Sequence, residues 1–301
     1  MIRGRHPRRS PHGDPLPGAG PEGPDDSPSC SCQAAWHHAN AGKSSGWTVR
    51  GLRQRARRAG RRARRETQTY ESILEAIAEG HHTPQEIGAQ LELTSGYLGP
   101  YLKQLVALHL VERRLPVTLP REKASSSRDG RYRLCDAYLR FYFRFIAPNL
   151  TIVEQEQTDL LWERIAEQLR AFVGVTAFEE ISRDWVRAMG RRRRLSMTPE
   201  NVGSHWSGGE QIDVVGINWR DRTMLAGECK WGGEKVGRGV VTELVEKAAR
   251  ARPDERFKLS YVVFARSGFT DAAKTEAKSR EVLLVDAETM ERDLREIDSG
   301  P

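Results

Sequence analysis

The order of apolar and polar positions divides the chain into a polar N-terminal stretch and a long patterned region. From residue 70, apolar residues recur at helical spacing in three short runs, which two extended runs follow. From residue 174, helical and extended runs alternate. The extended ones span 210–218, 223–231, 258–265 and 281–286. This alternation predicts an α/β domain over 174–295, with helices covering a central sheet.

Residues 69–134 predict three helices and a two-stranded wing. Ile73, Leu74 and Ile77 share one helical face, and Gly80 ends that helix. Thr83 and Pro84 begin a second helix, in which Glu86 completes a capping box. A third helix begins near Ser95, before the extended runs at 108–117 and 130–134. This order is that of a winged helix-turn-helix.

In this interpretation the third helix contacts DNA. Its outward residues are expected to be Ser95, Tyr97, Tyr101, Lys103 and Gln104. Four arginines of the wing can meet phosphates, namely Arg113, Arg114, Arg128 and Arg131. The same three-helix unit also serves as a rigid spacer or a protein-docking element, so DNA contact is one of two interpretations.

Residues 135–173 are expected to form a helical connector. The run CDAYLRFYFRFIAP interleaves aromatic residues with Arg140 and Arg144, which suits either base stacking or a packed core. The density of aromatic side chains favours the core. An amphipathic helix over 154–173 then carries Leu160, Leu161, Ile165 and Leu169.

Composition excludes several classes of protein. In 301 residues, 30% are charged and 38% hydrophobic, and no run approaches the ~18 apolar residues of a membrane span. The basic N-terminus has no apolar segment of a secretory signal behind it. Four cysteines are too few for a disulfide framework, so the sequence predicts a cytoplasmic protein.

The net charge of +7 is concentrated in the N-terminal stretch. Residues 1–69 hold 14 of the 48 Lys and Arg but only 5 of the 41 Asp and Glu. Residues 1–68 are therefore predicted to be a disordered tail whose arginine-rich segment, 50–65, binds a polyanion as a transient helix. The alternatives are a solvated tail or a start codon placed too far upstream. Cys30, Cys32, His37 and His38 are metal-ligand types, but their spacing is not that of a compact zinc module.

The candidate chemistry lies in the α/β region. Asp213 stands in one extended run, and Glu228 and Lys230 share a face of the next. The short turn between the runs predicts a hairpin that brings Asp213 beside Glu228. Carboxylate oxygens gathered in this way suit Mg²⁺, with Glu179 as a further ligand. Such an ion binds a scissile phosphate and polarises a water, which Lys230 orients or deprotonates.

The segments GVTAFEEISRDWV, GGEQIDVV and LAGECKW resemble the PD-(D/E)XK phosphodiesterase fold of restriction endonucleases and Holliday-junction resolvases. Residues ~70–290 more closely resemble the C-terminal portion of archaeal-type AAA ATPases, a domain of unknown function. The resemblance implies that Glu179 is the helix carboxylate, Asp213 the metal aspartate, and Glu228 with Lys230 the ExK pair. Ile212 replaces the proline that gives the motif its name.

The P-loop of these ATPases is absent from the 301 residues, so the chain is not expected to be an ATPase by itself. The first hypothesis is a Mg²⁺-dependent deoxyribonuclease that the winged helix positions on DNA. The second is a catalytically silent module that binds DNA or an ATPase subunit encoded separately. A remnant of a degraded ATPase gene is a third hypothesis.

Overall fold

The computed structural model describes residues 61–298 of the chain. The predictions for residues 1–60, including a metal site at Cys30, Cys32, His37 and His38, lie outside this range. The first described helix, α3, spans Arg61–Glu79. Residues 61–68, which the composition assigns to a disordered tail, are therefore helical. The difference arises because the helix that carries Ile73 and Ile77 continues backward into the arginine-rich segment.

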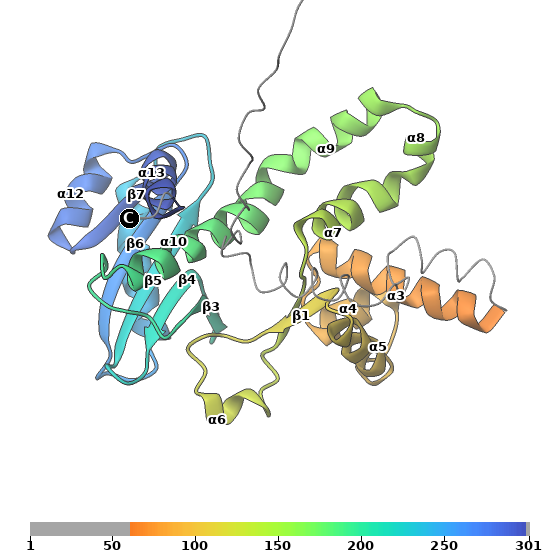
Figure 1. Ribbon diagram of the computed structural model, residues 1–301, viewed down its shortest axis with the longest axis horizontal. Helices are drawn as coiled ribbons and strands as arrows, with labels where there is room; N and C mark the ends of the chain where they lie inside the picture. The colour runs from red at the N-terminus through yellow and green to blue at the C-terminus, as the bar shows by residue number, and fades with distance from the viewer. Residues whose placement is uncertain (1–60, 299–301) are drawn as a thin grey trace, which may run out of the picture.

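Three helices form the first part of the described chain (Figure 1). After α3 come α4 (Pro84–Leu91) and α5 (Ser95–Ala107). Thr83 caps α4 as predicted, since its side chain accepts from the backbone N–H of Glu86 while the Glu86 carboxylate accepts from the backbone of Thr83. The three helices bury one shared apolar core, to which Ile73, Ile77, Ile87, Leu98, Leu102 and Leu105 contribute.

Two short strands follow the helices. β1 (Val111–Arg114) and β2 (Arg131–Leu134) pair antiparallel, with Val111 opposite Leu134. The segment between them is long and carries the short helix α6 (Arg121–Ala124). Three helices followed by a two-stranded antiparallel sheet are the elements that the sequence predicts for this region.

The connector is made of helices whose turns change in width. The elements are α7 (Ala137–Phe141), the π-helix η1 (Tyr142–Ile146), the 3-10 turn η2 (Ala147–Asn149), α8 (Leu150–Glu154) and α9 (Thr158–Val173). Phe143 packs in the core of the first three helices, and Phe145 stacks edge-on with Phe172. These contacts confirm the core interpretation for both rings. Tyr138, by contrast, is 68% exposed.

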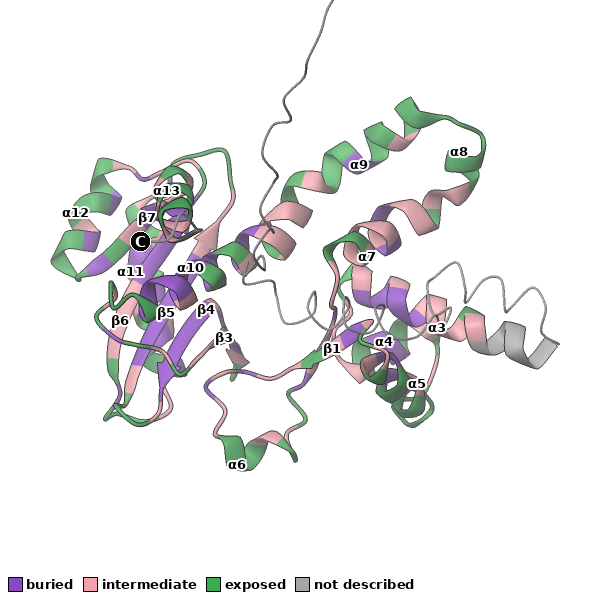
Figure 2. Ribbon diagram, viewed as in Figure 1, coloured by how far each residue is buried: buried purple, intermediate pink, exposed green. Residues whose placement is uncertain are grey.

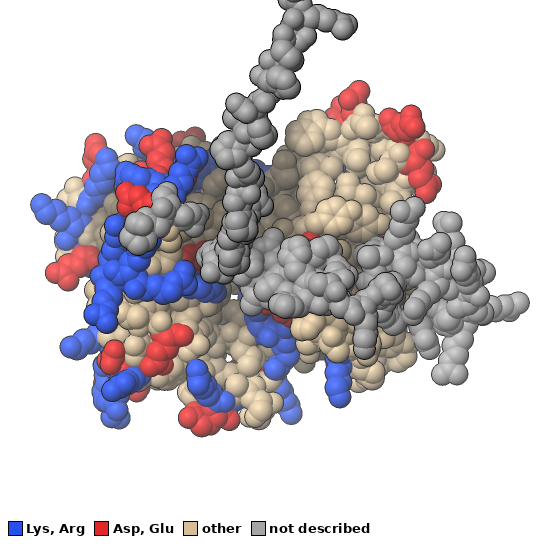
Figure 3. All heavy atoms as spheres, viewed as in Figure 1, with Lys and Arg blue, Asp and Glu red and all other residues tan. Residues whose placement is uncertain are grey.

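Helices α8 and α9 form an arm with little buried surface (Figure 2). Ile165 is the buried residue of α9, whereas Leu160 and Trp162 are exposed. The amphipathic pattern therefore predicts the helix correctly but not the burial of Leu160. Figure 3 shows acidic side chains gathered at the far end of this arm, where Glu154, Glu156 and Glu163 are exposed.

The second part is a five-stranded mixed sheet with helices on both faces. Its strands are β3 (Asn201–Ser207), β4 (Glu210–Asn218), β5 (Thr223–Lys230), β6 (Lys258–Ala265) and β7 (Val282–Asp286). They lie side by side in chain order. The pairs β3–β4 and β4–β5 are antiparallel, whereas β5–β6 and β6–β7 are parallel. The helices are the π-turn η3 (Gly174–Phe178), α10 (Glu179–Arg191), α11 (Arg238–Ala251), α12 (Asp271–Ser279) and α13 (Ala287–Asp298).

An apolar core lies on each face of this sheet. Val241 and Leu244 of α11 pack with Ile212 and Ala226 on one face. Trp185 of α10 and Met290 of α13 pack on the other face, in the cluster that contains Leu225. Since side chains alternate along a strand, residues 224, 226, 228 and 230 of β5 point toward α11. None of the helices described over 61–298 is long and apolar enough to cross a membrane.

The loop between β1 and β2 lies against the edge strand β3 and joins the two parts. The backbone N–H of Val117 donates to the Ser204 carbonyl at 3.0 Å. The buried side chains of Thr118 and His205 lie 2.6 Å apart, and the indole N–H of Trp206 donates to the Asp129 carbonyl at 2.7 Å. The predicted wing thus takes part in intramolecular packing.

Candidate functional site

A β-bulge in β4 sets the position of Asp213. Gly203 of β3 pairs with Val215 and His205 pairs with Ile212, so Ser204 alone faces two residues of β4. A bulge of this kind bends the strand and redirects a side chain. As a result Ile212 and Val215, three positions apart, reach the same core. Asp213 lies at the point where the regular alternation is interrupted.

The bulge also separates β4 from β5 at Asp213. The regular pairing of the two strands ends with Val214 opposite Gly227. One residue beyond, the carboxylate Oδ2 of Asp213 accepts a hydrogen bond from the backbone N–H of Cys229 at 3.0 Å. The Asp213 side chain is therefore the acceptor for this N–H, in place of a backbone carbonyl of the neighbouring strand. The hairpin predicted from the sequence brings Asp213 to the strand that carries Glu228, and residues 219–222 form its turn.

Glu228 and Lys230 lie on the same face of β5, as their spacing predicts. The Lys230 ammonium is 2.7 Å from Oε1 of Glu228, and its side chain is 41% exposed. The Lys247 ammonium of α11 is 3.8 Å from Oε2 of Glu228. This second oxygen is buried and accepts no hydrogen bond from any described residue. Glu228 therefore holds an unsatisfied oxygen at the end of the strand.

Glu179 is the first residue of α10 and approaches the same place from the opposite face of the sheet. Burial, and next the charge of Asp213, raise the pKa of Glu179 to about 7. The same two causes, in the same order, raise the pKa of Glu228. The charge of Asp213 is therefore near enough to repel both Glu179 and Glu228. Repulsion of this kind is common where a cation or a proton is taken up.

A buried arginine that the sequence analysis does not single out connects these elements. Arg183 is 1% exposed. Its Nη1 donates to the Asp213 carbonyl and to Oγ of Ser204, both at 2.7 Å, and to Oε2 of Glu179 at 3.4 Å. Arg183 thereby ties α10 to the bulge. The four-residue spacing from Glu179 is a signal for an ion pair on one helix, but the partners on β3 and β4 depend on the tertiary fold.

A chain of ion pairs leads from Arg183 to the β1–β2 hairpin. Glu180 lies 3.1 Å from Nη2 of Arg183 and 2.5 Å from Nη1 of Arg114, and Arg114 also pairs with Glu112. Burial acts to raise the pKa of Glu180, but the charges of Arg183 and Arg114 outweigh it and lower the pKa to about 2. The carboxylate is therefore ionised throughout the physiological range.

The residues predicted to contact DNA lie on the outer side of α5. Ser95, Tyr97, Lys103 and Gln104 are exposed. Tyr101 is half-buried, because its ring packs edge-on against Tyr70 at 5.0 Å and its hydroxyl lies 3.0 Å from that of Tyr97. The structure brings these residues to one surface, which leaves their contact with DNA a prediction.

The arginines predicted to meet phosphates differ in their surroundings. The Arg131 guanidinium lies 4.8 Å from the centre of the Trp206 ring and donates to Gln211 at 3.4 Å. Arg113 donates to the Ser127 carbonyl at 2.7 Å. Arg114 is paired with Glu112 and Glu180, whereas Arg128 is exposed. Arg131, Arg113 and Arg114 therefore already have intramolecular partners.

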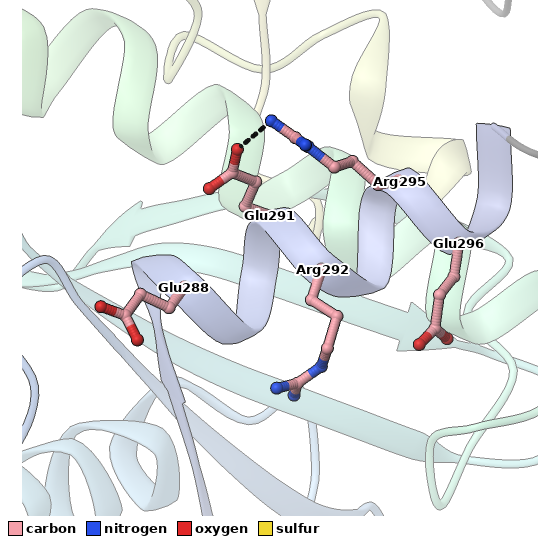
Figure 4. A pocket seen from close by; sticks show the side chains of 5 residues that line it. All are labelled: Glu288, Glu291, Arg292, Arg295 and Glu296. Atoms are coloured by element: carbon pink, nitrogen blue, oxygen red, sulfur yellow. Dashed lines mark hydrogen bonds and ion pairs between the residues drawn. The ribbon is translucent and has the colours of Figure 1, made fainter.

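Two further observations bear on a metal site. Within residues 61–298, no three His, Cys, Asp or Glu side chains are grouped so as to hold a metal ion together. A hollow of about 610 Å³ lies on α13, lined by Glu288, Glu291, Arg292, Arg295 and Glu296 (Figure 4). None of the carboxylates discussed above lines it, and its charges are of mixed sign. The candidate site is therefore the one at β4 and β5.

The fold and this site define a mixed α/β protein with a cluster of buried carboxylates. Residues 142–240 match a family model described as "Archaea bacterial proteins of unknown function" (DUF234). That range contains Glu179, Asp213, Glu228 and Lys230 but not the β1–β2 hairpin. The chain is also similar to the uncharacterized protein MJECL04 of Methanocaldococcus jannaschii, with 35% identity over 166 residues. The similar region is 55% of this chain and 36% of the relative.

Proposed function

We propose that this chain binds DNA through its three-helix part and carries a Mg²⁺-dependent phosphodiesterase site of the PD-(D/E)XK kind. The observation that carries the proposal is the unsatisfied Oε2 of Glu228, which is buried near the charge of Asp213. A buried carboxylate oxygen without a donor costs free energy unless a cation or a proton satisfies it. Burial, and next the charge of Asp213, raise the pKa values of both Glu228 and Glu179.

The small number of carboxylates at this site suits Mg²⁺ better than it suits a metal whose ligands all come from the protein. Mg²⁺ keeps several waters and is bound through one or two carboxylates together with substrate phosphates. Asp213 and Glu228 would supply the two carboxylates, and Glu179 would add a further oxygen only after it leaves its ion pair with Arg183. The lack of a three-residue group in the described chain is compatible with this ion, whereas a structural zinc site requires four close ligands.

Each residue of the site then has a distinct task. When bound by these residues, the ion would supply positive charge for the scissile phosphate and would lower the pKa of a water. Asp213 is held by the backbone of Cys229 and, through its carbonyl, by Arg183, so its orientation is fixed before any ligand binds. Lys230 is half-exposed beside Glu228, where its ammonium can orient the attacking water or, once it has lost its own proton, its amine can deprotonate that water.

The three-helix part is proposed to be a winged helix whose α5 contacts the major groove. Exposed Ser95, Tyr97, Lys103 and Gln104 on one side of α5 support this assignment, because small polar and basic side chains make such contacts. The resemblance to the C-terminal region of archaeal-type ATPases adds a second expected partner, an ATPase subunit encoded separately.

The alternative function is a catalytically silent module that binds DNA or an ATPase subunit. The observation that favours it is the pairing of Glu228 with two ammonium groups, those of Lys230 and Lys247. Two lysines can neutralise the carboxylate without any metal. The two functions therefore differ in whether a divalent ion displaces Lys230 and Lys247 from Glu228.

A nuclease assay beside a metal-binding measurement separates the two functions. The full chain is incubated with plasmid, single-stranded and branched DNA and with Mg²⁺ or Mn²⁺, while calorimetry measures binding of the ion alone. Asp213→Ala and Glu228→Ala are expected to abolish ion binding and cleavage together. Lys230→Ala is expected to keep ion binding and to lose about 10²–10⁴-fold in cleavage rate.

The matched control is Asp271→Ala, which removes a fully exposed carboxylate outside the site. It is expected to bind Mg²⁺ and to cut DNA like the wild type. Cleavage that persists in Asp213→Ala assigns the activity to another site or to a contaminant. A wild type that neither binds the ion nor cuts any form of DNA establishes the silent module instead.

A further inference from the structure

A second feature of the molecule is a cavity of about 940 Å³ between the β1–β2 loop, α10 and β3. Asn201, Val202, Gly203, Ser204 and Trp206 of β3 line it, so it follows the edge strand for most of its length. At about 3.3 Å per residue the lined stretch is about 16 Å long. Neither Asp213, Glu228 nor Lys230 belongs to the lining. The cavity therefore adjoins the carboxylate site through Arg183 and Ser204, but the carboxylates of the site do not line it.

Arginines dominate the charged lining of the cavity. The six are Arg114, Arg121, Arg140, Arg183, Arg187 and Arg191, against Glu112, Glu180 and Asp184. The three acidic side chains are already paired with Arg114, Arg183 and Arg187. Arg121, Arg140 and Arg191 have no acidic partner within the described residues, and Nε of Arg140 is buried without a hydrogen-bond acceptor. The cavity therefore holds an excess of cationic donors.

The cavity does not suit a peptide strand added to the sheet. Such a strand would need the outward carbonyls of β3 as acceptors. The Val202 carbonyl already accepts from Nη2 of Arg187 at 3.0 Å, and the Ser204 carbonyl accepts from the Val117 N–H. What the cavity offers is guanidinium donors, and these match the oxygens of a phosphate.

Aromatic surface accompanies the arginines. Trp206 and Trp219 both line the cavity. Arg131 lies over the Trp206 ring, which fixes the indole within the wall. Aromatic rings beside guanidinium groups are the combination that binds the bases and the phosphates of unpaired nucleotides. A volume near 940 Å³ is at the upper end of the range for sites that bind small ligands.

We propose that this cavity binds a nucleoside phosphate group, with guanidinium groups from among Arg121, Arg140 and Arg191 on the phosphate and the base against a tryptophan of the wall. The phosphate can belong to a free nucleotide or to the backbone of a short single strand, since both present the same chemistry. The proposal goes beyond the phosphodiesterase site, because it needs neither a divalent ion nor bond cleavage.

Binding of four probes to the full chain without divalent metal tests the proposal. The probes are thymidine, inorganic phosphate, thymidine 5′-monophosphate and a thymidine tetranucleotide, measured by calorimetry at one fixed salt concentration. The monophosphate or the tetranucleotide is expected to bind saturably, and thymidine alone is not. Binding of the monophosphate identifies the free nucleotide as the source of the phosphate, and binding of the tetranucleotide alone identifies the strand.

Variants then locate the binding. Arg140→Gln is expected to weaken binding about tenfold, which is about 1.4 kcal/mol. Arg121→Ala combined with Arg191→Ala changes exposed side chains, so it keeps the fold and is expected to weaken binding by at least as much. Arg256→Ala removes the same charge from a largely exposed position outside the cavity and is the control. Because all variants keep the arginine-rich segment 50–65, its contribution is the same in each.

Several results would overturn the proposal. The first is the absence of saturable binding by any phosphate probe. The second is binding that the double variant and Arg256→Ala reduce to the same extent. Equal affinity for inorganic phosphate and the monophosphate, or for a hexaglutamate peptide and the tetranucleotide, would disprove the role of the nucleoside. Loss of DNA cleavage in Asp213→Ala leaves this test unaffected, so each proposal can fail without the other.

Discussion

Glu179 offers a measurable pH dependence at the scale of one residue. Its pKa in the folded chain is about 7, against an ordinary value of 4.5. Between these values the folded chain binds more protons than the unfolded chain, so stability falls as pH rises from about 4.5 to 7. The difference corresponds to about 3 kcal/mol. Glu179→Gln removes this titration, so the free energy of unfolding of the variant should gain on that of the wild type from pH 5 to pH 8.

Urea unfolding of both proteins at pH 5, 6.5 and 8 measures this gain. The prediction concerns the slope against pH, because Glu179→Gln also removes the ion pair with Arg183 at every pH. Glu163→Gln, at an exposed position on α9, should change stability equally at all three values. Parallel curves of unfolding free energy against pH for Glu179→Gln and the wild type would contradict the raised pKa of Glu179.

The sequence predicts some site residues better than others for a physical reason. Glu228 and Lys230 stand two positions apart on one strand, and the period of a strand alone places them together. The short turn between two strands predicts that Asp213 lies beside the strand that carries Glu228. Arg183 joins β3, β4 and α10, and no local period links these elements. The bulge at Ser204 is also a property of pairing between strands, so the local pattern does not contain it.

Gly227 of β5 makes the packing of the sheet testable at the scale of an element. A Cβ at this position would lie 3.0 Å from Cγ1 of Val262 and 3.1 Å from Cβ of Val214. Both valines belong to the buried core and have little room to move. Gly227→Ala is therefore expected to lower the free energy of unfolding by about 1–3 kcal/mol.

The matched substitution is Gly239→Ala in α11, where a Cβ would meet no atom within 4 Å. Since alanine is the better helix former, this variant should be as stable as the wild type or slightly more stable. Denaturant midpoints at constant slope compare the two variants. A Gly227→Ala protein of unchanged midpoint would contradict the close packing of β5 between β4 and β6.

Most elements agree with the sequence prediction, and β3 and α13 are two exceptions. The extended runs at 210–218 and 258–265 coincide with β4 and β6, because β-branched and apolar residues fill them. The pattern does not predict β3, since NVGSHWS contains glycine, serine and asparagine and lies at the edge of the sheet. It also does not predict α13, although Met290, Leu294 and Ile297 recur at helical spacing and pack on the sheet.

The arginine-rich segment can be tested at the scale of the whole molecule. Because α3 begins at Arg61, removal of residues 1–60 leaves every described helix intact. This deletion takes away five of the nine arginines of segment 50–65. DNA affinity should fall, and the slope of log affinity against log salt should become shallower by about 0.9 for each phosphate that the shortened chain no longer neutralises. The melting temperature should not change.

Removal of residues 1–49 is the matched control, because it keeps all nine arginines of segment 50–65. The salt dependence of its DNA binding should equal that of the full chain, as measured by fluorescence anisotropy between about 50 and 200 mM salt. Equal slopes for both deletions and the full chain would show that the segment makes no phosphate contacts.

The two contacts that cover the edge of β3 also bear on how the protein behaves when concentrated. A free sheet edge is a template on which other chains add strands and begin fibrils. Arg187 and Val117 occupy the outward carbonyls of Val202 and Ser204, so this edge lacks free acceptors there. Aggregation by strand pairing at β3 therefore requires the β1–β2 loop to detach first. Conditions that loosen that loop should shorten the shelf life of the protein well before they unfold it.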